Sequence, residues 1–214
     1  MRDIPVFTTE YGVASLIFKE IPYRAEAYIR IHDLQPGMIA PMLEECVGFC
    51  RAVGAEKVYA AGSDELETYP LHTAVYEMRG EARIDREKTA NLFPATEQTV
   101  TCWREILNNR MLSVDNAGTL EKRDEKRILE SGGAYFVHDG GELLGVGWMD
   151  GETLLTVASA VPGAGERVMH SLMSLAEGSM LTLEVASTNN RAIRLYEKLG
   201  FFKTREISRW YRVR

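Results

Sequence analysis

The sequence has few cysteines, a deficit of basic residues and no long apolar run. The 3 cysteines among 214 residues, Cys46, Cys50 and Cys102, are an odd number. No second pair of Cys or His follows Cys46 and Cys50 at the spacing of zinc ligands. We therefore expect no metal site, and we expect the three thiols to pack in the core as small apolar side chains.

The deficit of basic residues bears on the partners. Lys and Arg number 25 against 31 Asp and Glu, which gives a formal net charge of −6. A protein that binds nucleic acid nonspecifically needs a basic surface, so we expect no nucleic-acid partner. The mild acidity is compatible with a cationic or amine substrate.

The lack of apolar runs bears on location. No run approaches the roughly 18 apolar residues of a membrane span, and the segment 1–6 lacks an apolar signal region. We therefore expect no membrane partner and a cytoplasmic location. With 45% hydrophobic and 26% charged residues, the composition is typical of a globular protein of one large or two small domains.

The most informative stretch is Asn189–Phe201, which follows an alternating, strand-like segment at 181–185. Ser187, Thr188 or either Asn can cap a helix start. One helical face then collects the apolar residues, and Gly200 is placed to end the helix. A plain strand and amphipathic helix would give this pattern, but it would not explain a tyrosine on the packed face beside an Asn at the helix start. The residues on that face are Ala192, Leu195, Tyr196 and Leu199.

This stretch resembles the C-terminal signature of the GNAT N-acetyltransferase family, Asn-x-x-Ala-x-x-Leu-Tyr-x-Lys-x-Gly-Phe, and every defining position from Asn189 to Phe201 matches. The resemblance implies an α/β GNAT fold, with a mixed, mostly antiparallel sheet and flanking helices. It also implies an acetyl-CoA-dependent transferase with Tyr196 near the thioester sulfur. In such a fold, two neighbouring strands part to admit the thioester arm between a glycine turn and a buried phenol.

The second half of the chain carries the full GNAT order of helices, meander, helix, strand, helix and strand. We expect helices over 99–112, 121–129, 168–176 and the signature segment, and strands over 134–137, 143–149, 154–158, 181–185 and the tail. The first half repeats part of this order, with strands over 12–21, 25–31 and 57–61, a helix with an apolar face from Met42 to Cys50, and a further strand at 73–78. We therefore predict two units, residues 1–88 as a degenerate GNAT-like half unit and residues 89–214 as the GNAT acetyltransferase domain. A chance match of a common motif is the alternative.

The cofactor-binding residues follow from a glycine turn and from the resemblance. Gly163, Ala164 and Gly165 open a helix, where free N–H groups and the helix dipole favour phosphate. By resemblance, the pantetheine arm lies along Val157, Ala158 and Ser159, and Asn189 reaches it from the other side. Ala160 stands where the family has Gln or Arg, so binding would rest on backbone donors, with help from Arg167. A plain helix start is the alternative.

For the chemistry, Tyr196 is the candidate acid, since its unperturbed pKa near 10 keeps it protonated at neutral pH. A tyrosine that only packs is the alternative. Glu184 is the candidate base, with Glu97, Glu105 and Glu152 as alternatives, directly or through a water. A backbone N–H of strand 157–159 would meet the oxyanion. His138 and His170 are expected at a turn and on a helix surface.

We therefore expect transfer of an acetyl group from acetyl-CoA, the co-substrate, to a primary amine on a small molecule or peptide, without a metal. The acceptor cannot be read from the sequence, and a homodimer stays open. One alternative is a catalytically inactive GNAT-like module that binds CoA or a partner. Another is a pair of CoA-independent structural units.

Overall fold

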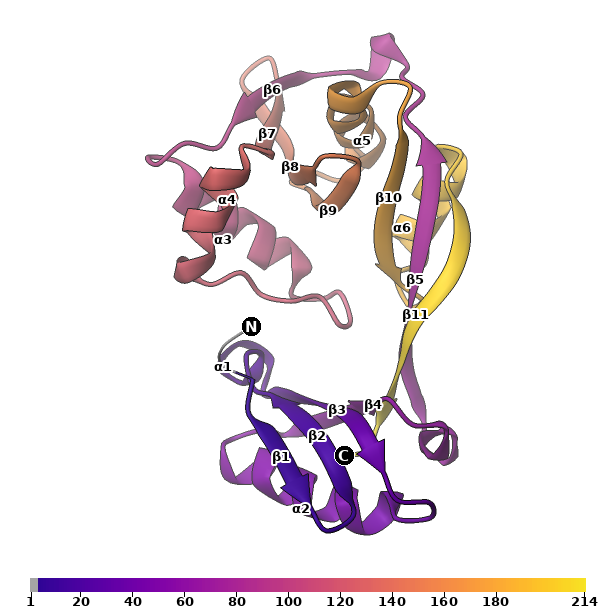
Figure 1. The fold of residues 1–214 in the computed structure, drawn as a ribbon. Helices are drawn as coiled ribbons and strands as arrows, with labels where there is room; N and C mark the ends of the chain where they lie inside the picture. Colours follow the sequence, from indigo (N-terminus) through magenta and orange to yellow (C-terminus); the bar gives the residue numbers. More distant parts are fainter. Residues whose placement is uncertain (1–3) are drawn as a thin grey trace. The chain divides into compact units, whose positions relative to one another are not determined.

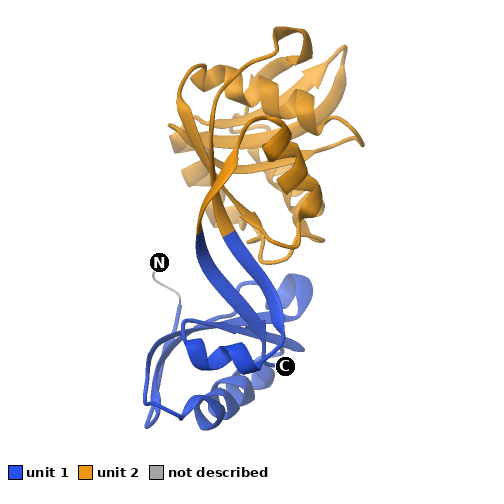
Figure 2. Cartoon of the chain, turned by 90° about the vertical axis from the view of Figure 1, so that its right-hand side faces the viewer, with its two compact units in different colours: residues 1–75, 206–214 blue, residues 76–205 orange. Residues whose placement is uncertain are grey.

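The computed structural model describes residues 4–214. Its internal contacts divide the chain into two compact α/β units (Figure 2). Unit 1 comprises the chain up to Val75 together with Glu206–Arg214, and unit 2 comprises Tyr76–Arg205. The division into residues 1–88 and 89–214 concerns the proposed repeat and stays a prediction.

Unit 1 is a sheet with one long helix (Figure 1). Its strand order is β1-β2-β3-β4-β11. The elements are β1 Val6–Thr9, β2 Gly12–Ile17, α1 Ile21–Arg24, β3 Glu26–Leu34, α2 Ile39–Ala52, β4 Lys57–Ala61, η1 Asp64–Thr68 and the end of β11 Phe202–Arg212.

The core of unit 1 forms where α2 packs on this sheet. The buried face of α2 consists of Met42, Leu43, Cys46 and Cys50, as its 3.6-residue spacing predicts. Strands β3 and β4 are parallel and pair without interruption from Glu26↔Lys57 to Arg30↔Ala61. Hydrogen bonds therefore join β3 and β4 along this whole stretch, and no gap opens between them.

Unit 2 carries most of the helices. Its strands follow the order β11-β5-β10-β9-β8-β7-β6. The elements are the part of β5 Leu71–Glu81 from Tyr76 onward, the first part of β11, η2 Arg86–Lys88, β6 Asn91–Pro94, α3 Val100–Met111, η3 Lys122–Asp124, α4 Glu125–Ser131, β7 Ala134–Asp139, β8 Glu142–Asp150, β9 Thr153–Ser159, α5 Gly165–Met173, η4 Ser174–Ala176, β10 Met180–Ala186 and α6 Asn190–Lys198.

Helices cover both faces of the sheet in unit 2. On one face, α5 and α6 pack over a core that includes Leu172, Leu183 and Tyr196. On the other face, α3 and α4 pack over a second core around Trp103 and Trp148, whose rings meet edge to face with centroids 6.4 Å apart. The mixed sheet with flanking helices is the architecture that the resemblance implied.

The expected helices and strands are present, except that the strand expected over 12–21 ends at Ile17 and Ile21 begins helix α1. The short elements β1, α1, η1, η2 and β6 were not expected from the sequence. In addition, β5 lies between β10 and β11 in the sheet. There, Glu77 of β5 accepts a hydrogen bond from the Thr204 hydroxyl of β11 at 2.7 Å and lies 2.9 Å from the Arg205 guanidinium.

The expectation that all three cysteines are buried is wrong for one of them. Cys46 and Cys50 are buried, but Cys102 is exposed. On α3 the buried position is the next residue, Trp103. Consecutive helical residues point about 100° apart, so burying Trp103 turns Cys102 outward.

Gly133 provides a test of the packing in unit 2. A Cβ at this position would lie 1.7 Å from the carbonyl oxygen of Met149, and this backbone atom cannot move without breaking the ladder. We expect Gly133→Ala to lower the free energy of unfolding by about 3 kcal/mol. Gly118→Ala is the control, since nothing lies within 4 Å of its added Cβ. Equal thermal melting of the two variants would contradict this account.

Candidate functional site

The central feature of unit 2 is the gap that opens between β9 and β10. These parallel strands pair only at Thr153↔Thr182 and Leu154↔Leu183. Within the described chain, no further pairing joins the rest of β9 to β10. A β-bulge sits at the same point, because the register to β8 shifts by one residue between Trp148↔Thr156 and Met149↔Leu154. The extra residue is Leu155, which is exposed. The expected parting of two strands is confirmed.

The gap leaves backbone donors on β9 without a strand partner. The N–H of Ala160 donates to Leu144 of β8 at 2.7 Å. Because N–H groups alternate in direction along a strand, those of Val157 and Ser159 face the other edge, towards the gap. The side chains alternate too, with Val157 in the core under α5 and α6 and Ala158 in the core under α3 and α4.

The glycine turn lies where β9 ends and α5 begins. Gly163 has a φ of 83°, a left-handed conformation that favours glycine. Gly165 is the first residue of α5, and a Cβ there would lie 3.1 Å from Leu195 of α6 and 3.3 Å from the Ser159 hydroxyl. Glycine therefore lets the start of α5 approach both the end of β9 and helix α6. Ala164 precedes this start and is buried.

Tyr196 projects from α6 into the same core as Val157 and Val185. Its ring is buried, and its centroid lies 6.1 Å from that of Phe201. Burial raises the pKa of Tyr196 to about 12. Within residues 4–214 the hydroxyl has no hydrogen-bond partner, although a buried tyrosine hydroxyl usually finds one. The phenol is therefore buried, protonated at neutral pH and available to a ligand.

Asn189 and Glu184 differ in how far their side chains are engaged. The Asn189 carboxamide oxygen accepts a hydrogen bond from the Ala192 N–H at 3.2 Å and so caps α6. Glu184 lies on β10 one residue past the last pair with β9, and its side chain is exposed. It makes no ion pair with any residue in the described range. The alternative bases Glu97, Glu105 and Glu152 are exposed and lie outside β10.

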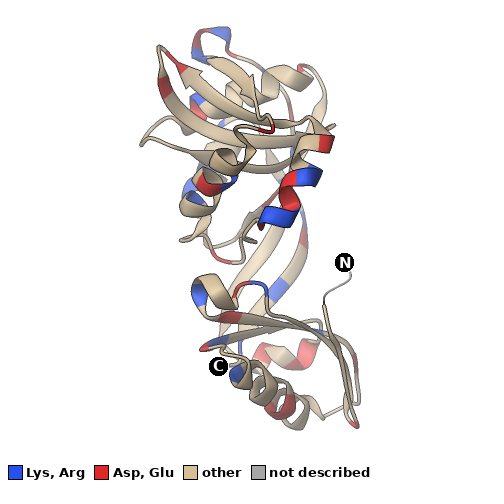
Figure 3. Ribbon diagram, turned by 90° about the vertical axis from the view of Figure 1, so that its left-hand side faces the viewer, with Lys and Arg blue, Asp and Glu red and all other residues tan. Residues whose placement is uncertain are grey.

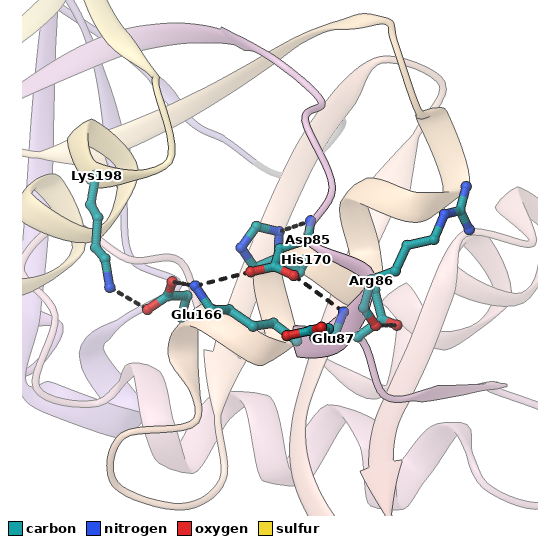
Figure 4. A network of polar contacts seen from close by, with 8 residues as sticks. Asp85, Arg86, Glu87, Glu166, His170 and Lys198 are labelled. Atoms are coloured by element: carbon teal, nitrogen blue, oxygen red, sulfur yellow. Dashed lines mark hydrogen bonds and ion pairs between the residues drawn. The ribbon is translucent and has the colours of Figure 1, made fainter.

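A network of charges joins three segments at the start of α5 (Figure 4). Glu166, in the first turn of α5, pairs with Lys198 of α6 and lies 2.8 Å from the Lys88 ammonium. Hydrogen bonds from these two lysines lower the pKa of Glu166 to about 2. Lys88 also lies 3.2 Å from Asp85. Lys198 is the lysine of the signature, so one member of this network could have been picked out from the sequence.

Arg167, expected to help binding at the glycine turn, has an acidic partner. Its guanidinium lies 2.6 Å from the Asp139 carboxylate, and this pairing lowers the pKa of Asp139. Charges of both signs are interspersed along the elements of both units (Figure 3). Arg167 is therefore already neutralised by a partner on β7.

His170 is buried, which corrects its expected place on a helix surface. The segment after β5 crosses α5 and covers it. The Asp85 N–H donates to Nδ1 of His170 at 3.3 Å, and the Ala90 N–H donates to the Ser171 hydroxyl at 2.8 Å. His138, expected at a turn, is half-buried within β7.

Two findings concern metals and membranes. Residues 4–214 contain no group of three or more His, Cys, Asp or Glu side chains placed to hold a metal ion. In the same range, no helix combines the length and the apolar character needed to cross a membrane.

Comparison with known proteins identifies the fold. No protein-family model matches the sequence, and no curated protein matches it. Among solved structures, GCN5-related N-acetyltransferases from Kribbella flavida and Anabaena variabilis superimpose with a TM-score of 0.58 each, at 12% and 8% identity. The chain has the GNAT fold.

The extent of these matches differs. The alignments cover 96% of this chain for the Kribbella flavida structure and 94% for the Anabaena variabilis structure, and 58% of each of those chains. This chain therefore spans a little over half of their length. A functionally unknown conserved protein from Staphylococcus epidermidis matches over 99% of this chain and 94% of its own, with a TM-score of 0.59 and 9% identity. At these identities the likeness concerns the fold.

The burial of His170 leads to a pH prediction. Burial lowers its pKa below the ordinary value of 6.5, against the opposing charges of Asp85 and Glu166. The unfolded chain therefore takes up the proton first, so stability is full above pH 6.5 and falls as the pH drops below it. The variant His170→Asn keeps a hydrogen-bond acceptor near the position of Nδ1. We expect its free energy of unfolding to fall less steeply below pH 6.5 than that of the wild type, by up to about 1.4 kcal/mol per pH unit.

Denaturant unfolding of wild type and variant across pH 5–7 measures this difference, with His138→Asn as the matched control. Parallel pH profiles for the wild type and His170→Asn would show that the buried imidazole does not set the slope.

Proposed function

We propose that the protein is an N-acetyltransferase that moves an acetyl group from acetyl-CoA to a primary amine, with the reaction centred on unit 2. The parting of β9 and β10 beside the glycine turn carries this proposal. Unit 1 offers a contrast, since its parallel strands β3 and β4 pair along five consecutive residues, whereas β9 and β10 pair along two. A peptide-like arm can enter only where the backbone groups are not already paired.

The residues around the gap suit the parts of acetyl-CoA. The N–H groups of Val157 and Ser159 can bond the amides of the pantetheine arm, as a neighbouring strand would. The turn Gly163–Gly165 and the first N–H groups of α5 can receive the diphosphate, aided by the helix dipole. The unused amide of Asn189 is a further donor at the start of α6. Each of these roles is part of the proposal.

The transfer itself needs an acid and an exit for one proton. The amine nitrogen attacks the thioester carbon, the carbon–sulfur bond breaks, and the sulfur leaves with the bond electrons. Tyr196 gives its proton to this thiolate, and the amine releases one to Glu184 or to water. The free phenol and the exposed carboxylate are the groups on α6 and β10 that support this assignment. A β9 N–H next to the bulge would stabilise the oxyanion.

Binding of acetyl-CoA is the first test. We expect the melting temperature to rise with ligand concentration, because a ligand at 100 times its dissociation constant adds about 2.7 kcal/mol of stability. ADP at the same concentration is the control for nonspecific nucleotide binding. If millimolar acetyl-CoA leaves the melting curve unchanged, the proposal fails.

Replacing Tyr196 tests the acid. We expect Tyr196→Phe to lower kcat by about 10²-fold or more, the usual contribution of a general acid. The folded protein should melt as before, because the lost hydroxyl has no protein partner within the described residues. Thiol release with an accepted amine measures kcat. Tyr135→Phe on β7 is the matched control, and an unchanged kcat in Tyr196→Phe would remove Tyr196 from this role.

A second function is favoured by one observation. Ala160 stands where the resembled family has Gln or Arg, a loss that suits a catalytically inactive module that binds CoA or a partner. Such a module would show the thermal shift with acetyl-CoA but would release no thiol with any amine or peptide in a broad screen.

A further inference from the structure

Arg110, near the end of α3, is bonded to the turn between β9 and α5. Its guanidinium donates a hydrogen bond to the carbonyl oxygen of Ala160. The N–H of Ala160 donates to Leu144 of β8, so the residue that Arg110 contacts is itself bonded to the sheet. Arg110 of α3 thus places a positive charge beside Ala160, the position at which the resembled family has Gln or Arg.

The other cations bonded around the start of α5 are balanced by carboxylates. Lys88 and Lys198 share Glu166 and Asp85, and these four charges sum to zero. Arg167 is paired with Asp139 in the same way.

Arg110 is different, because within residues 4–214 its only polar partner is the neutral carbonyl of Ala160. Its side chain is exposed. Arginine has five N–H donors in a planar fork, and this carbonyl occupies one of them. An unbalanced charge and free donors therefore remain at the turn.

We infer that Arg110 binds the diphosphate of acetyl-CoA and supplies from α3 the charge that Ala160 cannot. This inference rests on the proposed function. A guanidinium binds phosphate through parallel, charge-assisted hydrogen bonds. In this role Arg110 holds the carbonyl of Ala160 with one donor and the diphosphate with others, which fixes α3 to the turn when the co-substrate binds.

The test compares Arg110→Met with Arg110→Lys by calorimetric titration of acetyl-CoA. Loss of a charge-assisted hydrogen bond should raise Kd about tenfold to a hundredfold in Arg110→Met. Arg110→Lys keeps the charge but lacks the planar guanidinium, so its Kd should lie between those of the wild type and Arg110→Met. Arg51→Met, which removes an exposed arginine from α2 of unit 1, should leave Kd at the wild-type value.

Two further readouts separate phosphate binding from a structural effect on the turn. The Kd of the wild type should rise more steeply with salt than that of Arg110→Met, since ion pairing is screened. For S-acetylpantetheine, which has the thioester but no nucleotide, kcat/KM should be the same in wild type and Arg110→Met. If both thioesters lose kcat/KM equally, Arg110 shapes the turn and the inference is overturned.

The outcomes also separate this inference from the function it rests on. If the wild type does not bind acetyl-CoA, the proposed function itself fails. If the wild type binds and Arg110→Met binds equally well, only the assignment of Arg110 fails. Loss of affinity in Arg191→Met or Arg194→Met on α6 instead would place the anion there and likewise overturn the assignment.

Discussion

The hydrogen-bond ladder between β9 and β10 ends after Leu154 and Leu183, and the organisation of unit 2 follows from this interruption. Two parallel strands that stay paired bury their backbone groups in each other, as β3 and β4 do in unit 1. Where pairing stops, the N–H and C=O groups of β9 need another partner, because unpaired backbone groups are costly to enclose. In the proposed function, a peptide-like ligand is that partner, and the fold need not change to receive it.

Packing on the α5 side keeps the strands in their places. Gly145 and Gly147 of β8 allow α5 to lie close to the sheet, since an added Cβ would come within 2.8 Å of Val168 and 2.2 Å of Leu172. Gly165 in turn lets α6 approach the start of α5. The charge network around Glu166 joins these helices at their exposed ends. The gap is therefore bordered by a rigid layer of helices, in which the few small residues fix the spacing.

Local sequence patterns predicted most helices and strands, because burial on one face imposes a period that the residues display. The signature from Asn189 to Phe201 likewise pointed to the GNAT fold. Contacts between segments far apart in the chain could not be predicted from local sequence patterns. Nothing near Arg110 indicates that it meets Ala160, and the position of β5 between β10 and β11 depends on pairing across more than 100 residues. His170 looked like a surface residue because the segment that covers it comes from before α3.

The path of the chain has a consequence for synthesis. Strand β4 pairs with β11 through Ala60↔Tyr211 and Tyr59↔Arg212, so the sheet of unit 1 cannot be completed before residues 206–214 have been synthesised. Until then the nascent chain presents an open β4 edge, the kind of surface on which other chains can add. Closing a contact over such a separation is slow. The sheet of unit 1 is thus completed only after unit 2 has been synthesised, although most of its strands precede unit 2 in the chain.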